Sequence, residues 1–246
     1  VNDIGETNAA KITVTAVDNV GNTVRYSKDF AVDNQDPRIE VTFDNNDVRN
    51  ERYFRADRTA TIAVTDINFN PATSTITTEV IPSEWVQNGD TWTAHCIYAT
   101  DAEYTLAVTS TDLTEKNVTV DEEVVYTGVA PQDFVIDKTA PEITVTYNPV
   151  AHDGVEPNGV LHYDEELTAT ITIEELNFNA ADVQADMGAG RGLDGWATND
   201  IRHTTHETYG VGNNYRFTVD YTDLAGNPAV GYESPSFSVD MGAPEI

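Results

Sequence analysis

The chain has 246 residues and carries 42 aspartates and glutamates against 13 lysines and arginines, which gives a net charge of −29 at pH 7. Nucleic-acid binding is excluded, because phosphate contacts need a basic face. Membrane insertion is not predicted, because no run approaches about 18 apolar residues. The single cysteine, Cys96, rules out an intrachain disulfide, and we expect a quiet, buried or half-buried thiol rather than a nucleophile.

The first elements in chain order are two predicted strands at about 11–17 and 24–32, where apolar and polar residues alternate. This period of two is typical of half-buried strands. The same alternation continues at 39–43, 58–64, 91–99, 104–108, 143–147, 167–173 and 215–221. No window shows the 3.6-residue period of a helix, so the pattern predicts an all-β fold built from antiparallel β-sandwiches.

Turn residues separate these strands. Residues 88–89 are Asn-Gly, which predicts a two-residue hairpin loop with positive φ at both positions. Asn70 and Asn179 each precede a short segment that we expect to form one helical turn, capped by the asparagine side chain. The aromatic residue before each cap, Phe69 or Phe178, is expected to close one end of the core.

One motif occurs three times along the chain. Asp33, Asp137 and Asp240 each lie four residues before a proline. The prolines are residues 37, 141 and 244, so they are 141 − 37 = 104 and 244 − 141 = 103 residues apart. A period of about 100 residues suits a whole small domain repeated in tandem.

The repeats predict four parts. Residues 1–36 form the C-terminal hairpin of a preceding repeat, 37–138 and 139–242 form two complete domains, and 243–246 begin the next repeat. We expect both domains to be the same sandwich. The predicted core residues of the two domains are Ile62, Val64, Val108, Ile171, Ile173 and Val219.

Three short motifs carry a family resemblance. These are Asp-Leu-Ala-Gly-Asn at 223–227, Thr-Ala-Pro-Glu-Ile at 139–143, and a Phe-x-Val/Ile-Asp run at 30–33, 134–137 and 237–240. With them the chain resembles the bacterial immunoglobulin-like repeats of Gram-positive surface proteins. The resemblance implies tandem immunoglobulin-like sandwiches in an extracellular, secreted or cell-wall-attached protein. It implies no shared active site.

The first full repeat departs from this pattern. Its turn at 112–117 lacks the glycine, and 137 − 112 = 25 residues separate Asp112 from Asp137, against 240 − 223 = 17 between Asp223 and Asp240. The extra segment at 119–131 is therefore a candidate special feature. The second repeat has its own insertion at 148–159.

The sequence gives only a weak indication of catalytic groups. The acidic runs 121–123, 165–166 and 174–175 could supply an acid and a base, but 42 acidic residues produce such runs by composition alone. Neighbours in a strand also face opposite sides. His203 and His206 lie three apart in a predicted strand, so they face opposite sides as well, and we expect surface histidines. The sequence therefore predicts no enzyme, and no catalytic, cofactor-binding or metal-binding residue.

Calcium is the alternative cofactor. Acid-rich junctions such as 33–36 could supply oxygen ligands to a hard cation. The later junctions keep only one acid before the proline, however, so we interpret the junction aspartates as turn and hydrogen-bond residues. Excess calcium is then expected to change the melting temperature by only a degree or two.

The three tryptophans could form a sugar-stacking surface. Trp85 and Trp196 occupy equivalent places, each 19 residues before an anchor tyrosine (104 − 85 and 215 − 196), which favours a structural role. Trp92 has no tryptophan counterpart, since residue 201 or 202 is expected at its place. It is the better candidate for an exposed contact.

The sequence thus predicts a non-catalytic modular spacer, or stalk, that displays a distal adhesive or enzymatic domain. The alternative is an adhesin module that binds host glycan or protein through 119–131 or 148–159 and is stabilised by calcium. Partners are otherwise expected to bind through neighbouring domains, with the chain monomeric within a longer protein. Short proline-containing linkers and like charges predict an extended, stiff arrangement.

Overall fold

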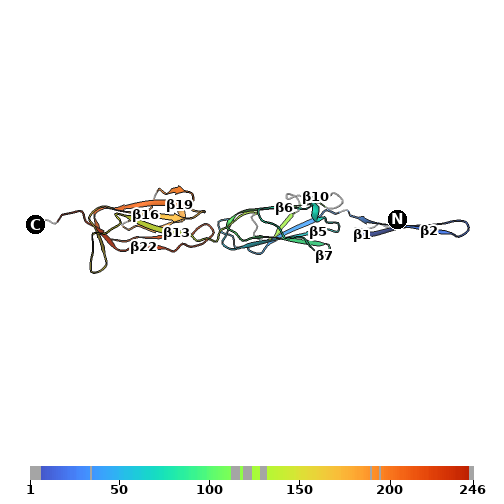
Figure 1. Ribbon diagram of the computed structural model, residues 1–246, viewed down its shortest axis with the longest axis horizontal. Coiled ribbons are helices and arrows are strands. Elements are labelled where there is room, and N and C mark those ends of the chain that lie inside the picture. The colour runs from blue at the N-terminus through green and yellow to red at the C-terminus, as the bar shows by residue number, and fades with distance from the viewer. Residues whose placement is uncertain are drawn as a thin grey trace. The chain divides into compact units, whose positions relative to one another are not determined.

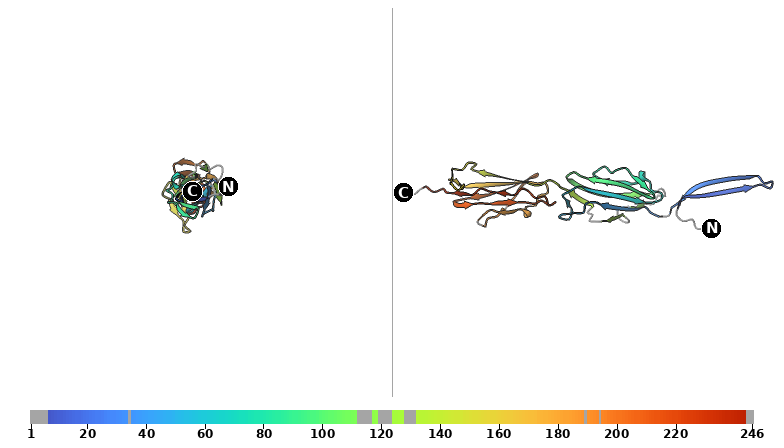
Figure 2. Two further views of the ribbon diagram at one scale, coloured as in Figure 1. Left: turned by 90° about the vertical axis from the view of Figure 1, so that its right-hand side faces the viewer. Right: turned by 90° about the horizontal axis from the view of Figure 1, so that it is seen from below.

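A computed structural model describes residues 7–33, 35–111, 117–118, 124–127, 132–188, 190–193 and 195–243. The chain divides into two compact units, 1–136 and 137–246. Strands and loops make up both units, and the described helical residues are confined to two short 3₁₀ turns, Pro71–Thr73 and Ala180–Asp182. Figures 1 and 2 show strands arranged in two layers within each unit.

Unit 1 begins with a two-stranded antiparallel sheet. Its strands are β1 (Thr7–Val17) and β2 (Thr23–Val32), as the alternation predicted. The pairing puts Ile12 opposite Lys28 and Val14 opposite Tyr26, so the apolar side chains share one face. More than half of each of Ile12, Val14 and Tyr26 is exposed.

In the rest of unit 1, the described residues form two sheets. One has the order β11-β3-β5-β8-β7 and the other β10-β9-β12-β4, with β6 also paired to β9. The strands are β3 (Arg38–Phe43), β4 (Tyr53–Phe54), β5 (Arg58–Thr65), β6 (Thr75–Thr78), β7 (Val86–Asn88), β8 (Thr91–Tyr98), β9 (Ala102–Thr111), β10 (Asn117–Val118), β11 (Val124–Thr127) and β12 (Asp133–Ile136).

Unit 2 is built from three sheets, with orders β13-β16-β19-β18, β14-β15-β23-β20 and β17-β21-β22. The strands are β13 (Glu142–Asn148), β14 (Gly154–Val155), β15 (Leu161–Tyr163), β16 (Leu167–Glu174), β17 (Gln184–Asp186), β18 (Ala197–Asn199), β19 (Arg202–Tyr209), β20 (Gly212–Tyr215), β21 (Thr218–Asp220), β22 (Tyr232–Glu233) and β23 (Phe237–Val239).

The two units share one strand order. The sheet β3-β5-β8-β7 of unit 1 corresponds to β13-β16-β19-β18 of unit 2. In the other layer, β6 corresponds to β17, and β9 corresponds to the successive strands β20 and β21. The strand β12 corresponds to β23, and β4 corresponds to β15. This is the A-B-E-D and C-F-G arrangement of an immunoglobulin-like sandwich. The predicted all-β, immunoglobulin-like fold is therefore confirmed.

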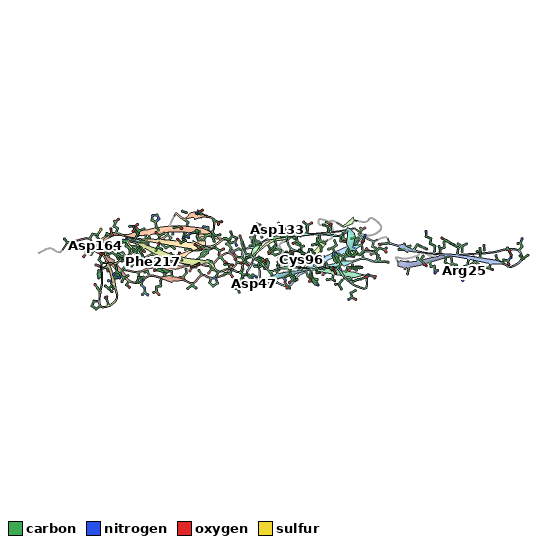
Figure 3. The ribbon with its side chains drawn as sticks, viewed as in Figure 1. Arg25, Asp47, Cys96, Asp133, Asp164 and Phe217 are labelled. Atoms are coloured by element: carbon green, nitrogen blue, oxygen red, sulfur yellow. The ribbon has the colours of Figure 1, made fainter. Side chains whose placement is uncertain are left out.

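The core follows from the period-two alternation. The burial of β5 alternates between buried and half-buried along Arg58–Val64, and the six predicted core residues are all fully buried. Aromatic rings fill the remaining space around Phe134 in unit 1 and Phe217 in unit 2. Figure 3 labels Phe217 among the side chains of its unit.

Arg58 is an exception to the apolar core. It is fully buried, and its guanidinium carbon lies 3.6 Å from the centre of the Phe43 ring and 4.2 Å from that of Phe54. Its Nε donates to the carbonyl of Asn45 at 3.0 Å. Burial lowers the pKa of Arg58 to about 10. Aromatic faces and a backbone carbonyl thus surround the Arg58 cation in place of water. Unit 2 has the apolar Leu167 at the equivalent position.

The turns agree with the sequence in kind, with one shift. Asn70 Oδ1 accepts from Ala72 N at 3.1 Å, and Asn179 Oδ1 accepts from Ala181 N at 3.2 Å, so both caps are confirmed. The predicted loop at 88–89 was wrong by one position. Asn88 pairs with Thr91, so the loop is Gly89-Asp90. Only the first position of this loop needs the positive φ that glycine tolerates.

The two insertions differ in outcome. Residues 148–159 include β14, which pairs with β15 at the end of the sandwich. Most of 119–131 lies outside the described residues. Its described part, β11, pairs in parallel with β3. In the part of the chain that the structure describes, no helix is long and apolar enough to cross a membrane.

Truncating the core of unit 1 should destabilise it much more than truncating its surface. We expect Ile62→Ala to lower the free energy of unfolding by about 2–4 kcal/mol, because the side chain is fully buried. Ile97→Ala on the neighbouring strand is the matched control, since Ile97 is 62% exposed, and its cost should be about 0.5 kcal/mol or less. Urea denaturation measures both, and equal costs would contradict this packing.

Candidate functional site

Three carboxylates from distant parts of the sequence meet at one end of unit 2. Asp137 follows β12, Glu175 follows β16, and Asp223 lies in the turn after β21. One carboxylate oxygen from each lies within 4.8 Å of the others. All three residues are buried, with at most 5% exposed surface. This cluster is the candidate site.

Asn177 ties two of these carboxylates together. Its side-chain Nδ2 donates to Asp137 Oδ2 at 2.7 Å, and its backbone N–H donates to Glu175 Oε1 at 2.7 Å. Asp137 Oδ1 also accepts from the backbone N–H of Thr139 at 3.3 Å. Asp137 therefore has the hydrogen-bonding turn role that the sequence predicted, within a cluster that it did not predict.

Asn227 holds the third carboxylate. Its backbone N–H donates to Asp223 Oδ1 at 2.8 Å, and its Nδ2 donates both to Asp223 Oδ2 at 2.9 Å and to the carbonyl of Asp137 at 2.9 Å. The Asp-Leu-Ala-Gly-Asn turn closes around this arrangement with Gly226 at φ +89°. The family-like motif thus positions one member of the cluster.

Burial, together with the two neighbouring acids, raises the proton affinity of Glu175. Burial, followed by the nearby charges of Asp137 and Asp223, raises the pKa of Glu175 to about 7, despite the hydrogen bond from the backbone N–H of Asn177. Near neutral pH the cluster can take up a proton at Glu175. Carboxylate oxygens are also the ligands that hard cations such as Ca²⁺ prefer, although such ions need six to eight oxygens.

His203 lies beside the cluster, and the prediction of a surface histidine was wrong. It is buried, and its ring stacks on Phe178 at a centroid distance of 4.0 Å. Its Nε2 donates to the carbonyl of Glu175 at 2.8 Å, and Nδ1 lies 3.0 Å from Thr198 Oγ1. His206 is exposed as predicted.

Strand register explains the burial of His203. His203 pairs with Ile173 just as Trp92 pairs with Val64 in unit 1. His203 therefore occupies the position equivalent to Trp92. The sequence-based prediction, which put residue 201 or 202 at this position, was wrong. In both units a ring at this register packs against the aromatic residue that precedes the cap.

The tryptophans pack against the core instead of forming an open platform. The ring centroids of Trp85 and Phe69 lie 5.1 Å apart, and those of Trp196 and Phe178 are also 5.1 Å apart, in equivalent places of the two units. Trp92 also lies against Phe69, at 5.6 Å, and is half-buried. Trp92, which the sequence suggested for an exposed contact, thus packs against the core of unit 1.

Unit 1 repeats part of the cluster. The side chain of Asn68 donates to Asp33 Oδ2 at 3.0 Å and its backbone N–H donates to Asp66 Oδ1 at 2.7 Å. These contacts match those of Asn177 with Asp137 and Glu175. Asp112, the sequence counterpart of Asp223, lies outside the described residues.

The remaining acidic runs do not form a comparable group. Residues 165 and 166 are exposed, Glu174 forms an ion pair with Arg202 at 3.2 Å, and 121–123 lie outside the described residues. Glu174 and Glu175 diverge, as expected for neighbours at a strand end. The described residues bring together one group of three metal-ligating side chains, the cluster above.

A sequence signal for the cluster did exist. Each of its acids lies one to three residues beyond a strand, and each has an acidic counterpart one repeat earlier, at 33, 66 and 112. The alternation placed these residues beyond the strands, but it could not show that three strand ends meet. That requires the strand order.

Comparisons with known proteins identify no family. No family model matches the chain, and no curated protein matches it. Among solved structures, the Escherichia coli adhesin FdeC is 18% identical with a TM-score of 0.35, over 84% of this chain and 64% of that chain. This chain thus spans less than two thirds of that structure.

Two further solved structures are similar to this chain. The fibronectin(III)-like modules of Clostridium thermocellum CbhA are 14% identical, with a TM-score of 0.26, over 81% of this chain and 94% of that chain. The tandem Ig repeats of Dlar are 11% identical, with a TM-score of 0.18, over 83% and 97%. All these scores are below 0.5, so the fold assignment rests on strand order.

The cluster predicts that unit 2 becomes less stable as pH rises from about 4.5 to 7. The pKa of Glu175 is raised in the folded chain, so the folded state binds the proton more tightly than the unfolded state. The stabilisation is complete below the unfolded pKa and is lost as pH rises through about 7. Its full size is on the order of 3 kcal/mol.

Urea denaturation in the presence of a chelator, at several pH values between 4.5 and 8, measures this effect. Glu175→Gln should flatten the profile, because the amide cannot titrate. Glu174→Gln is the matched control, since Glu174 lies one residue away and is paired with Arg202, and it should leave the profile unchanged. A wild-type profile that matches Glu175→Gln would rule out titration at this position.

Calcium separates the two chemistries that the cluster allows. The sequence-based expectation is a change in melting temperature of a degree or two between excess calcium and chelator at pH 7. A cation held by the three carboxylates would instead raise it by many degrees, because binding at 100-fold excess over Kd contributes about 2.7 kcal/mol. Differential scanning calorimetry of wild type and Asp223→Asn distinguishes these results.

Proposed function

We propose that this chain is a non-catalytic, modular part of a bacterial surface protein that acts as a spacer for a distal adhesive or enzymatic domain. The observation that supports this most directly is the repetition of one sandwich, with one strand order, in both units. A repeated fold adds length in equal steps.

The repeat boundaries are part of the proposal. Residues 37–138 and 139–242 are taken as two complete repeats, 1–36 as the end of a preceding one and 243–246 as the start of the next. The turn of the β1–β2 hairpin supports this. Asn22 donates to Asp18 from N at 2.9 Å and from Nδ2 at 2.7 Å, as Asn227 does to Asp223.

The proposed family is that of the bacterial immunoglobulin-like repeats, and the proposed location is extracellular, secreted or attached to the cell wall. The three sequence motifs and the immunoglobulin-like strand order support both. Partners such as host or cell-surface glycans and proteins would then be bound mainly by neighbouring domains. The chain itself is proposed to be monomeric within its parent protein.

A ligand-binding adhesin module is the second candidate. It needs an exposed apolar surface, and the insertion at 148–159 does expose Val150 and Val155, at 88% and 53%. These are two single side chains, one in a loop and one in β14, and isolated surface apolar residues are ordinary. The spacer role is therefore preferred.

Small-angle X-ray scattering of a protein spanning 37–242 tests the spacer role. Strands of about ten residues at roughly 3.3 Å per residue give a module about 30–40 Å long, so we expect a maximum dimension of about 60–80 Å. Repulsion between the acidic modules is confined to the junction by a Debye length of about 8 Å, so moderate salt should change little. A compact, nearly spherical particle would remove the physical basis of a spacer.

A further inference from the structure

The first strands of the two sandwiches differ in how many neighbours they have. In unit 1, β3 lies between β5 and β11. In unit 2, β13 is the outer strand of its sheet, and β16 is the one described strand that pairs with it. The connection that carries β11 in unit 1 is eight residues longer (25 − 17) than its equivalent in unit 2.

Side-chain burial differs in the same place. In β3, Ile39 and Val41 are fully buried and Phe43 is 6% exposed. Their equivalents in β13 are only half-buried. These equivalents are Ile143, Val145 and Tyr147. The sandwich of unit 2 therefore keeps an incompletely covered apolar edge.

The backbone of β13 presents hydrogen-bonding groups at this edge. Glu175 N donates to the carbonyl of Ile201, towards β19, so the preceding Glu174 directs its backbone groups to β13. Glu174 pairs with Glu142, and the direction alternates from residue to residue. The N–H and C=O groups that point away from β16 are therefore those of Ile143, Val145 and Tyr147.

A groove runs beside this edge. It has a volume of about 380 Å³ and lies between the start of β13 and the segment leading into β22. Tyr147 and Tyr232 meet across the two sheets through their hydroxyl groups at 2.9 Å. The lining residues are Pro141, Glu142, Ile143, Val230, Gly231 and Tyr232. Ile143, whose N–H and C=O point away from β16, thus lines this groove.

We propose that the outer edge of β13 is a docking site for an extended segment of another protein, which adds a strand parallel to β13. Unit 1 supplies the template, since β11 pairs in parallel with β3 over four residues, from Val124 opposite Ile39 to Thr127 opposite Thr42. Strand addition takes affinity from backbone hydrogen bonds and specificity from alternate side chains. The four residues that pair in this way in unit 1 have the sequence Val-Val-Tyr-Thr.

The negative charge of unit 2 favours a partner segment with basic flanking residues. Residues 141–246 contain three arginines and 18 acidic residues, so their net charge is −15. Glu142 lies at the groove itself. A segment with basic residues on both sides of an apolar core is therefore favoured, whereas a second copy of this acidic chain would be repelled.

Nuclear magnetic resonance of the ¹⁵N-labelled full chain tests the site with the synthetic peptide KKVVYTKK. In the free chain, the outward amides of Ile143, Val145 and Tyr147 should exchange faster than the inward amides of Thr144 and Thr146. The peptide should slow exchange at the outward amides by about tenfold or more. The acidic peptide EEVVYTEE should have no effect, because its charge matches that of the unit.

Two variants at one position separate backbone pairing from side-chain contact. Val145→Pro removes an outward N–H and should weaken peptide binding by about tenfold or more, while Val145→Ala keeps the N–H and should stay within about threefold. Unchanged signals from Ile171 and Val219 would show that the unit is folded. Should Val145→Pro unfold the unit, the outward amides and the acidic peptide still test the proposal.

Three results would overturn this proposal. The first is that the outward amides are unaffected by millimolar KKVVYTKK, and the second is that a folded Val145→Pro binds as tightly as Val145→Ala. The third is that the free chain protects these amides by self-association that increases with its concentration, which would assign the edge to a second copy.

Discussion

The alternating burial of β5 and β16 is the constraint on which the remaining structure depends. Each of these strands pairs with a neighbour on both sides and directs every second side chain between the two layers of its sandwich. These side chains are buried only when the opposite layer is present, so both layers must form together. Where these central strands end, the chain turns sharply, and at those ends the acids and asparagines of the candidate site are brought together.

Much of the fold could be predicted because strand periodicity is a local property. The alternation at Ile62 and Val64 indicates which side chains face inward without knowledge of any partner strand. The caps at Asn70 and Asn179 are equally local. The position of the 89–90 loop was missed by one residue, because hairpin register depends on pairing between β7 and β8 as well as on turn propensity.

The site could not be predicted to the same extent, because it depends on which strand ends are neighbours. Asp137, Glu175 and Asp223 are separated by 38 and 48 residues (175 − 137 and 223 − 175) and meet only in the folded unit. His203 shows the same limit. Its residue type suggested a surface position, whereas its register opposite Ile173 places it in the ring layer that Trp92 occupies in unit 1.

Repetition with small differences links the fold to its proposed uses. Both units keep the pair of hydrogen bonds from one asparagine, Asn68 or Asn177, to an aspartate that lies just before the repeat and to an acid just beyond the central strand. What changes between the units is the edge: β11 covers β3, whereas β13 has one described neighbour. The two copies of one sandwich therefore differ at the edge beside their first strand.

The position of Cys96 has a practical consequence for studying this chain. It is the only cysteine among 246 residues, it is fully buried in unit 1, and burial raises its pKa to about 11. A thiol reagent can therefore reach it only when the sandwich of unit 1 opens. Figure 3 labels Cys96 within this unit. The rate of labelling under heat, denaturant or mechanical pulling would report the opening of unit 1 alone, with no engineered probe and no signal from unit 2.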